Sequence, residues 1–459
     1  MFAQDRTWRT MRELLYGMLT CMGRRTITGA LCSTGQQFED WSSAYRLFEM
    51  SRVNMPGLWQ VLLTQATREM DPGMPVIGVV DDTTMPKTGK KVHGTGWRRD
   101  AKGPRFQTNL IWAQQVVETA LVLPKNGWAS PGRAIAVDLV NVAKPSRPRK
   151  NATPQQVADY QHQRKAGSLG AIGAGCIKRL RENLDERPAC RGRKLLISLD
   201  GGYTNRTVFR SITPNTALIG RVRADAAIFA APASQRRTGR PRTYGERLPT
   251  PQQIKNDSDI PWVTVAAYAA GRIHHCAVKT VAPVRWKPAG GTDLRLLVIG
   301  ELRYPRAGKP GLEHRGPAYL VCTDPDTPLD QLLQAYLWRW EVEVGFREQK
   351  TTMGMGQAQV RTEAAVPLVP AFVAMAYTIL HIAAARAGIH QIGLPLPRWR
   401  QHRPPRRAST AQLLNHLRAE LWGHALHHSF TGFANTIEQW RTPTNPASML
   451  ASAVLYANQ

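Results

Sequence analysis

Two short apolar runs, each followed by aspartate, constrain the fold of this chain more than any other feature. Residues 76–80 precede Asp81 and Asp82, and residues 195–199 precede Asp200. Runs that are apolar on both faces are typical of central strands in an α/β sheet with helices on both sides. An acid at the end of such a strand faces the crevice in which these sheets bind ligands. The sequence therefore predicts an α/β core with carboxylates where two buried strands end.

The segment after the second run allows two interpretations of Asp200. Gly201 and Gly202 follow it directly, and glycines let the backbone approach a group that the carboxylate binds. Aspartate before glycine is also common where it only caps a turn or the next helix. Position alone leaves a ligand-binding role and a structural role open.

Further segments predict the neighbours of these two strands. We expect strands at residues 108–112 and 116–123, which suit an antiparallel meander, and another strand at 217–222. Residues 154–187 predict a helix with a glycine-rich weak point at 167–175. The order of strand, meander, helix, strand and helix is that of an RNase H-like core.

A β-rich segment and a helical segment flank this core. Residues 261–303 alternate and carry many β-branched side chains, which indicates a β-rich subdomain inserted before a strand at 318–322. The first seventy residues have apolar side chains at helical spacing, with basic connections that suit a DNA-reading module. We expect five parts: an N-terminal helical DNA-binding region (1–72), the first part of the core (73–224), the inserted subdomain (225–317), the second part of the core (318–390), and a basic linker with a helical tail (391–459).

Residues 332–350 predict a long helix with one reactive stripe. At 100° per residue, Tyr336, Arg339, Glu343 and Lys350 fall within about 60° of one another. The other glutamates of this segment fall on a different side, so the geometry singles out Glu343. The alternative is an ordinary amphipathic helix whose charges form a solvated face.

The charge balance points to a polyanionic partner. The 459 residues contain 61 Lys and Arg against 33 Asp and Glu, a formal net charge of +28. Nucleic acid is the first candidate, because a basic membrane-surface protein needs an amphipathic Lys/Arg helix that we do not find. The six cysteines form no CxxC pair, and the first residues do not resemble a secretion signal. We expect a cytoplasmic, nucleoid-associated protein.

One apolar segment is long enough to cross a membrane. Residues 364–385 contain no charged side chain. They include two prolines and a histidine and are rich in alanine. We therefore expect a buried helix of the protein core and no membrane partner.

Three carboxylates stand out by position: Asp82, Asp200 and Glu343. An RNase H-like core would bring them together, and such a cluster of like charges is unfavourable unless a cation neutralises it. Hard oxygen ligands select Mg²⁺ or Mn²⁺. Two such ions, about 3.5–4 Å apart, support phosphodiester chemistry on a nucleic acid.

The sequence resembles the DDE transposases of bacterial insertion sequences at three places. Residues 80–84 resemble the first-aspartate motif, in which the acid directly before threonine is the ligand, and this favours Asp82 over Asp81. Residues 199–203 resemble the second-aspartate motif. The stripe from Tyr336 to Lys350 matches the Y-R-E-K signature of the family. The resemblance covers residues 75–390, and the family with this signature also carries an inserted β subdomain.

The resemblance implies roles for the residues of the site. Tyr336, Arg339 and Lys350 would hold phosphates near the transposon end, while Glu343 completes the two-ion metal site. Trp286 is the candidate to stack on a flipped base, although tryptophan in a β subdomain more often belongs to the core. The implied reaction is nicking at the element's ends, followed by attack of the freed 3′-hydroxyl on target DNA. The implied partners are double-stranded element ends and target DNA, bound by a homodimer.

Two alternatives remain open at this point. The first is a metal-dependent DNA nuclease of the same fold that cuts without strand transfer. The second is a non-catalytic DNA-binding protein that keeps the fold. A transposase needs the three acids for cleavage and also gives joined products. A nuclease would cut without joining, and a non-catalytic relative would bind DNA without cutting it.

Overall fold

The computed structural model describes residues 4–100, 103–104, 106–232, 242–305, 312–389, 396, 398–402, 404–405 and 407–429. The chain forms two compact units. One consists of Met1–Leu62 and Phe346–Gln459, and the other of Leu63–Gly345. Helices α4 (Met55–Arg68) and α10 (Trp340–Thr351) begin in one unit and end in the other.

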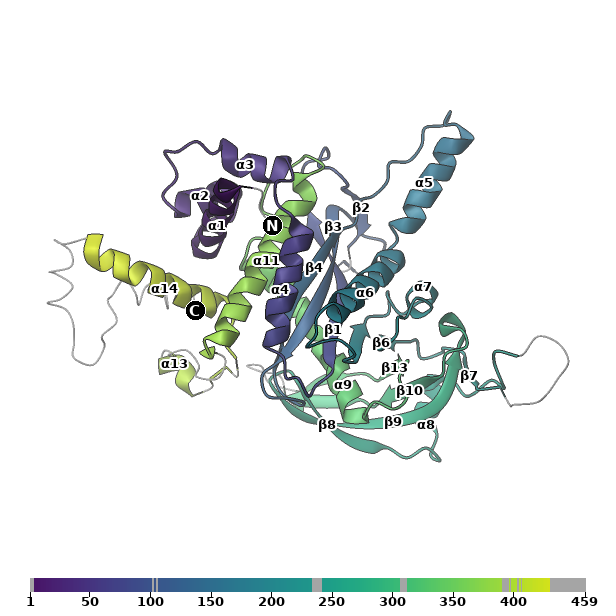
Figure 1. Ribbon diagram of the computed structural model, residues 1–459. Helices are drawn as coiled ribbons and strands as arrows, with labels where there is room; N and C mark the ends of the chain where they lie inside the picture. Colours follow the sequence, from purple (N-terminus) through teal and green to yellow (C-terminus); the bar gives the residue numbers. More distant parts are fainter. Residues whose placement is uncertain are drawn as a thin grey trace. The chain divides into compact units, whose positions relative to one another are not determined.

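The unit Leu63–Gly345 is built on a large mixed sheet (Figure 1). Its strands are β1 (Val76–Pro86), β2 (Gly96–Arg99), β3 (Leu110–Pro124), β4 (Gly132–Asn141), β5 (Leu195–Leu199), β6 (Thr216–Arg221), β7 (Ile228–Ala230), β8 (Val263–Ala269), β9 (Arg272–Trp286), β10 (Leu294–Ile299), β11 (Leu302–Pro305), β12 (Leu312–Arg315) and β13 (Ala318–Cys322). Its helices are α5 (Pro154–Ala166), α6 (Leu169–Asp185), α7 (Arg206–Phe209), α8 (Pro251–Asn256), the 3-10 turn η1 (Lys287–Ala289) and α9 (Leu329–Trp338).

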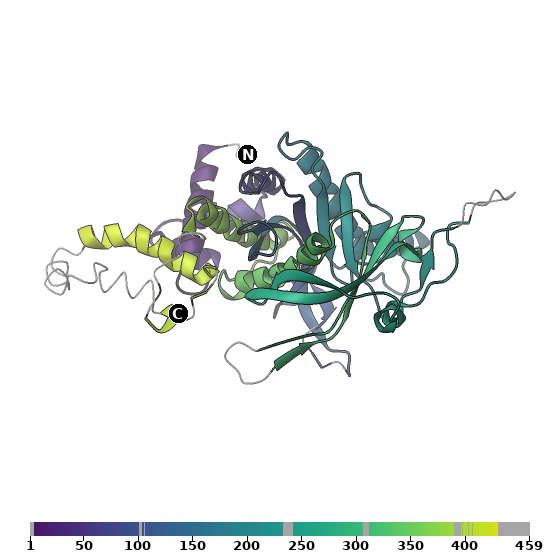
Figure 2. The same cartoon turned by 90° about the horizontal axis from the view of Figure 1, so that it is seen from below.

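The strand order confirms the predicted fold class. Strand β3 pairs antiparallel with both β1 and β4, and β5 and β6 run parallel to β1 on its other side. Three antiparallel strands followed by two parallel ones, with helices on both faces, form the mixed α/β arrangement of an RNase H-like core. Figure 2 shows the strands of this sheet passing between the helices of the unit.

The strands between 225 and 317 continue the same sheet. Strand β13 pairs with β6 on one side and with β10 on the other, and β9 and β7 follow. The pairing is stabilised by burial, since Leu296, Leu297, Leu320 and Val321 are fully buried where β10 meets β13. The β-rich segment therefore extends the central sheet, while β11 and β12 pair with each other.

Helices α6 and α9 cover opposite faces of the central strands. A side chain at Gly78 of β1 would meet Leu180 of α6. Ser198, which is paired in register with Val79, donates its hydroxyl to the carbonyl of Ala335 in α9 at 2.9 Å. Because successive residues of a strand face opposite sides, positions 78, 80 and 82 face α6, and positions 79 and 81 face α9. The neighbouring acids of β1 therefore lie on different faces.

Three local predictions are corrected by the structure. Strand β1 does not end at its acids but continues to Pro86, because residues 82–86 keep pairing with β3. The two expected strands at 108–112 and 116–123 are one strand, since the polar residues between them stay in the ladder. The expected long helix consists of α9 and α10, which meet at Arg339.

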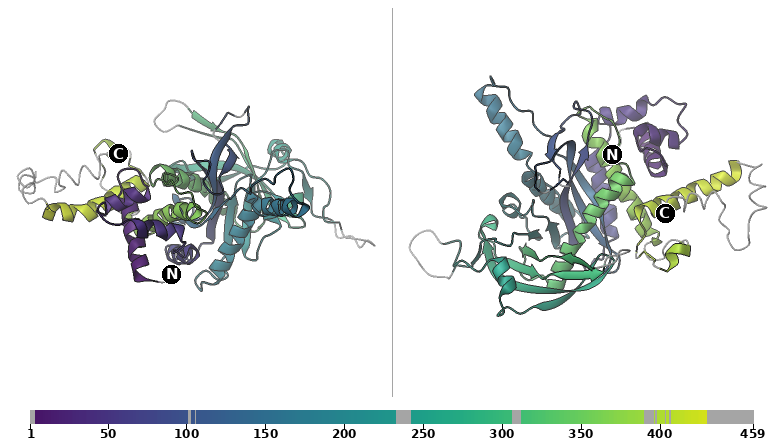
Figure 3. Two further views of the ribbon diagram at one scale, coloured as in Figure 1. Left: turned by 90° about the horizontal axis from the view of Figure 1, so that it is seen from above. Right: turned by 180° about the vertical axis from the view of Figure 1, so that it is seen from behind.

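Helix α5 differs from the other helices of this unit. It has a capping box at Thr153 and no buried residue. It extends from the start of α6 away from the sheet, as Figures 1 and 3 show. The predicted glycine-rich weak point corresponds to the break between α5 and α6 at Gly167.

The other unit is helical in the part that the structure describes. It contains α1 (Asp5–Thr20), α2 (Ile27–Ser33), α3 (Ser42–Glu49), α11 (Ala365–Arg386), α13 (Arg398–Gln401) and α14 (Thr410–Ser429), with parts of α4 and α10. The N-terminal helices pack with C-terminal ones. The rings of Phe48 and Phe372 meet edge to face at 5.6 Å, and Arg418 donates to the carbonyl of Cys21 at 3.0 Å. This grouping differs from the expected separate regions 1–72 and 318–390, and residues 430–459 of the expected tail lie outside the described part.

Helix α11 is the apolar segment that is long enough to cross a membrane. In its most apolar window, 78% of the residues are buried inside the protein. Tyr377 and His381 on this helix make ring contact at 4.4 Å, and His381 also bonds to Thr410 at 3.0 Å. The helix thus packs as part of the core of its unit, as expected.

Candidate active site

Asp81 and Asp82 are neighbours on β1 with different surroundings. Asp81 is 9% exposed, and its Oδ1 accepts a hydrogen bond from the backbone N–H of Asp82 at 2.8 Å. It is paired in register with Glu118 of β3, which is also buried. Asp82 is half-buried on the other face of the strand. Two acids in one strand therefore present carboxylates to both faces of the sheet.

Both oxygens of Asp82 are engaged by neutral donors. Gln115 of β3 donates to Oδ2 at 2.6 Å, and the Tyr203 hydroxyl donates to Oδ1 at 3.1 Å. The aromatic ring of Tyr203 can approach because α6 has Gly173 at the contact. A Cβ there would lie 2.6 Å from the Tyr203 ring. The glycine of α6 therefore keeps room for the side chain that orients Asp82.

Asp200 follows β5 directly and organises a tight turn. Its Oδ1 accepts hydrogen bonds from the backbone N–H groups of Gly202 at 2.8 Å and Tyr203 at 3.1 Å. Its backbone carbonyl accepts the hydroxyl of Thr204 at 2.7 Å. A Cβ at Gly202 would lie 3.2 Å from Asp200 Oδ1, so glycine allows the backbone to approach the carboxylate. Asp200 therefore has the structural role of stabilising this turn through Oδ1, and these hydrogen bonds do not use Oδ2.

Arg339 joins the helical carboxylate to the sheet. Its Nη1 lies 3.3 Å from Asp81 Oδ2, and its Nη2 lies 3.1 Å from Glu343 Oε1. The guanidinium also lies over the Tyr336 ring, 5.9 Å from its centroid. Its side chain is 15% exposed and that of Glu343 is 37% exposed. Arg339 and Glu343 meet because residues four apart on a helix are neighbours.

Electrostatic interactions tie these groups into one cluster. Burial, and then the negative charge of Asp200, raise the pKa of Asp81 to about 7, although Arg339 opposes this shift. Burial also raises the pKa of Asp82, against the hydrogen bonds from Gln115 and Tyr203. Burial would lower the pKa of Arg339, but the surrounding negative groups outweigh it, and the net shift is upward. Asp200 therefore acts on the sheet acids and on the arginine.

The donor set fits a divalent cation by its chemistry. Carboxylate oxygens are the hard ligands that Mg²⁺ and Mn²⁺ select, and clustered acids need positive charge nearby. Across the described ranges, no three acidic, imidazole or thiol side chains are grouped closely enough to bind one ion. The positive charge between Asp81 and Glu343 is supplied by Arg339. An ion shared by these two carboxylates would have to take the place of the guanidinium.

Two further residues, Lys350 and Trp286, are predicted to contact DNA. Lys350 lies in the last turn of α10, in the helical unit. Trp286 ends β9, where its half-buried side chain meets the ring of Phe209 edge to face at 5.4 Å. The structure therefore describes Trp286 as a packing residue next to α7.

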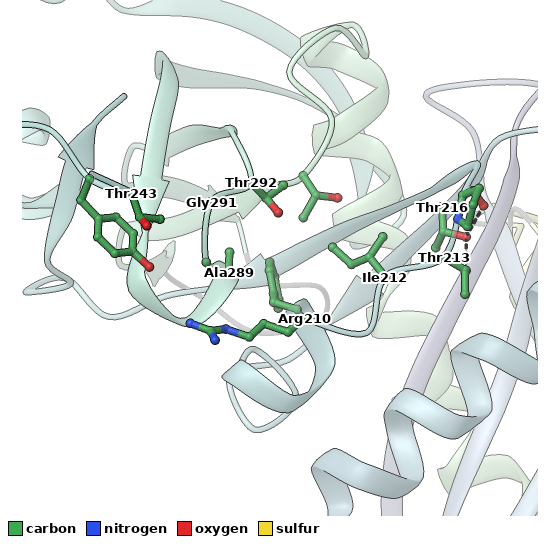
Figure 4. Close-up of a pocket in the computed structure, with 13 residues that line it drawn as sticks. Arg210, Ile212, Thr213, Thr216, Thr243, Ala289, Gly291 and Thr292 are labelled. Atoms are coloured by element: carbon green, nitrogen blue, oxygen red, sulfur yellow. Dashed lines mark hydrogen bonds between the residues drawn. The ribbon is translucent and has the colours of Figure 1, made fainter. Parts of the chain in front are cut away.

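A cavity of about 800 Å³ lies in the same unit as the carboxylates (Figure 4). Arg210 and several threonines line it, but none of the carboxylates described above does. The Arg210 guanidinium donates to the backbone carbonyls of Lys287 at 3.2 Å and Pro288 at 3.3 Å. These bonds connect α7 to η1, so Arg210 stabilises one wall of the cavity.

Three side chains that contact the candidate site do not stand out in the sequence, or stand out less than their neighbours. The motif favours Asp82, and the structure places Asp81 in contact with Arg339. Gln115 is a polar residue inside a long apolar strand, and that contrast is a usable signal for a buried polar site. Tyr203 follows the Asp-Gly-Gly turn, but nothing in the local sequence indicates that its hydroxyl reaches Asp82.

Comparison with known protein families gives one match. The model of a family described as DDE superfamily endonuclease matches residues 2–287, more than half of the chain. The matched range includes Asp81, Asp82 and Asp200, and it ends before the helix that carries Glu343. A search of curated proteins found no match to this sequence.

Proposed function

The chain belongs to the DDE superfamily of endonucleases, and from this membership we propose that it is a DNA transposase. It would cut the ends of its mobile element and join the freed 3′-hydroxyls to target DNA. The observation that carries the proposal is the meeting of Asp81 of β1 and Glu343 of α10 at Arg339, with Asp200 directly after the neighbouring parallel strand β5. The formal net charge of +28 supports DNA as the substrate.

We propose that Asp81, Asp200 and Glu343 are the metal ligands. Asp81 lies on the α9 face and shares Arg339 with Glu343, whereas Asp82 lies on the other face of the strand, where it is bound by Gln115 and Tyr203. Asp82 then has a positioning role, as part of the network that fixes the turn after β5. The sequence preference for Asp82 remains the competing assignment, and separate substitution of the two acids distinguishes them.

The ions would be two Mg²⁺ or Mn²⁺ held by these carboxylates. When bound, such a pair activates the attacking hydroxyl and stabilises the leaving oxygen of the phosphodiester. The protein's own groups orient the DNA around that chemistry. Arg339 can form two parallel hydrogen bonds with phosphate oxygens, because its guanidinium presents a planar fork of donors.

The remaining members of the Y-R-E-K signature support the same proposal. Tyr336 lies beneath Arg339, which restricts where the guanidinium can go. Lys350 would supply a further point charge to the DNA backbone. We propose that the protein acts as a homodimer on double-stranded DNA, at the nucleoid, because the two ends of an element have to be cut together. Trp286 remains a candidate for stacking on a flipped base, although its contact with Phe209 favours packing.

The test is a reaction on supercoiled plasmid DNA that carries the element's own ends. Wild-type protein should cut at the ends with Mg²⁺, give joined products, and do neither in EDTA. Glu343→Gln should bind the ends but not cut them. Glu341→Gln is the matched control, because this acid lies on the same helix outside the cluster. Cutting without joining would indicate a nuclease, and normal cutting by Glu343→Gln would contradict the proposal.

A further inference from the structure

The backbone makes 3-10-type hydrogen bonds where α9 and α10 meet. The N–H of Arg339 donates to the carbonyl of Tyr336 at 3.1 Å, and the N–H of Val342 donates to the carbonyl of Arg339 at 3.1 Å. Bonds that span three residues have poorer geometry than those of an α-helix, and a short stretch of them often marks a functional hinge. The direction of the Arg339 side chain therefore depends on contacts that hold this junction to the sheet.

Trp338, directly before Arg339, anchors the junction. It is 2% exposed, and its Nε1 donates to the carbonyl of Ser130 in the turn between β3 and β4 at 2.9 Å. Its indole also stacks on that of Trp128 in the same turn, with centroids 5.4 Å apart and planes 18° apart. A Cβ at Gly132, the first residue of β4, would lie 2.9 Å from the Trp338 ring, so glycine lets the indole lie against the strand. A hydrogen bond and a ring stack thus hold the neighbour of Arg339.

The turn that receives Trp338 is itself fixed by internal bonds. The hydroxyl of Ser130 donates to the carbonyl of Gly127 at 2.8 Å and accepts the backbone N–H of Asn126 at 3.2 Å. Ala129 has a positive φ of 52°. Such a conformation costs energy for alanine and persists where the surrounding contacts hold it in place. The turn is therefore a defined support for the indole.

Arg339 contacts a different part of the sheet from its neighbour. Its guanidinium reaches Asp81 of β1 at 3.3 Å and Glu343 of α10 at 3.1 Å. These distances are near the upper limit of a hydrogen bond, so a shift of about 1 Å would break both contacts. Because Trp338 and Arg339 are consecutive residues, a displacement of the indole would move the guanidinium as well.

We propose that Trp338 is a positioning residue for the reaction. Docked in the β3–β4 turn and stacked on Trp128, it holds the Arg339 guanidinium between the two carboxylates that meet there. Trp338 acts only through Arg339 and contacts neither the DNA nor the ions. The inference rests on the proposed function, because it has a role for catalysis only if Asp81 and Glu343 bind metal.

The first test is a double-mutant cycle on Mn²⁺ affinity, measured by titration calorimetry at pH 8 without DNA. Trp128→Ala removes the stacked ring, and Trp338→Phe keeps a ring at its position but removes the N–H donor. Each should raise Mn²⁺ affinity about threefold, because a guanidinium that is held less well competes less with metal. In the Arg339→Ala background, neither substitution should change the affinity further, since coupled residues are not additive.

Cleavage of plasmid DNA that carries the element's ends is the second test. Trp128→Ala and Trp338→Phe should lower kcat roughly 10- to 100-fold, with KM for DNA changed less than about twofold, because positioning is lost and DNA contacts are not. Trp128→Phe should cut as wild type does, since it keeps a stacking ring. Trp262→Ala is the matched control, because Trp262 is a 42% exposed tryptophan of the same unit that lies next to Lys279.

Circular dichroism first establishes that each variant is folded. Equal effects of Trp128→Ala on Mn²⁺ affinity with and without Arg339 would overturn the inference, because a purely structural role does not depend on the arginine. Unchanged Mn²⁺ affinity and unchanged kcat of Trp128→Ala and Trp338→Phe would overturn it too, and would leave the proposed function intact. If wild-type protein bound no Mn²⁺ and cut no ends, the proposed function itself would fail, and the inference with it.

Discussion

The guanidinium of Arg339 bridges Asp81 and Glu343, with its two terminal nitrogens 3.3 Å and 3.1 Å from their carboxylate oxygens. The two acids come from a strand and a helix that are far apart in the sequence. A single cation in this position offsets the repulsion between them, as a divalent ion would. On the proposed assignment of the metal ligands, Arg339 would compete with metal for these carboxylates in the protein without DNA.

Replacing Arg339 with alanine should increase the affinity for Mn²⁺ in the absence of DNA. The expected gain is roughly 10-fold, or about 1.4 kcal/mol, the scale of one hydrogen bond between charged groups. Arg339→Lys should give a smaller gain in Mn²⁺ affinity, because lysine keeps the positive charge but lacks the two parallel N–H donors of the guanidinium. Titration calorimetry at pH 8 measures the change, since Asp81 is then ionised. Equal or weaker Mn²⁺ binding by Arg339→Ala would contradict the competition.

Separate substitutions of the two neighbouring acids should have unequal effects on cleavage. Asp81→Asn should lower the rate by about 1,000-fold or more, because it removes a proposed metal ligand. Asp82→Asn should lower it by roughly 10-fold, the cost of losing one charged hydrogen-bond acceptor. Both variants should bind duplex DNA as wild type does. A larger loss with Asp82→Asn would favour the assignment made from the motif.

The buried Asp81 should make stability depend on pH in metal-free buffer. Its pKa is raised from 3.8 to about 7 in the folded state, so the unfolded chain ionises at lower pH than the folded one. This carboxyl therefore causes no loss of stability below about pH 4. Its destabilising effect grows between about pH 4 and 7. Above that range it lowers the free energy of unfolding by on the order of 4 kcal/mol.

Urea unfolding in EDTA isolates this contribution by comparing wild type with Asp81→Asn. The variant should gain stability relative to wild type at pH 8, and the gain should shrink at pH 5. Opposite pH dependence would mean that Asp81 is stabilised in its charged form. Added Mn²⁺ should restore stability to wild type and not to the variant.

The contact between α6 and Tyr203 predicts an effect of a single methyl group. Gly173→Ala places a Cβ 2.6 Å from the Tyr203 ring, which should cost about 1–3 kcal/mol of unfolding free energy. Gly175→Ala on the same helix is the control, because its nearest neighbour would be 3.5 Å away. Denaturant unfolding followed by circular dichroism compares them. Equal stability of the two variants would show that the ring has room to move.

The central strands could be predicted because their sequence pattern is local. Strands β5 and β13 match the apolar runs that precede Asp200 and lie at 318–322. Runs that are apolar on both faces can only be buried between two layers, and this fixes their place in the sheet. The same runs predict where the acids lie, with Asp200 after β5 and Asp81 and Asp82 within β1.

What could not be predicted depends on contacts between distant segments. Gln115 falls between the two strands expected at 108–112 and 116–123, but its amide donates to Asp82 while its backbone stays in the ladder of β3. The helical wheel placed Arg339 next to Glu343 correctly, since that contact is four residues apart. The choice of Asp81 as the other partner depends on how α9 packs against this face of the sheet. No periodic pattern in the sequence encodes that packing.

Replacement of the two proposed aspartate ligands by cysteine tests the metal site most directly. A thiolate is a softer ligand than a carboxylate, so it should hold Mg²⁺ poorly and Mn²⁺ better. Asp81→Cys and Asp200→Cys should fail to cut the element's ends with Mg²⁺ and regain cutting with Mn²⁺. Asp82→Cys should show no such dependence on the metal. Two results would contradict the proposed site. The first is full activity of Asp81→Cys and Asp200→Cys with Mg²⁺. The second is rescue by Mn²⁺ of Asp82→Cys and not of Asp81→Cys.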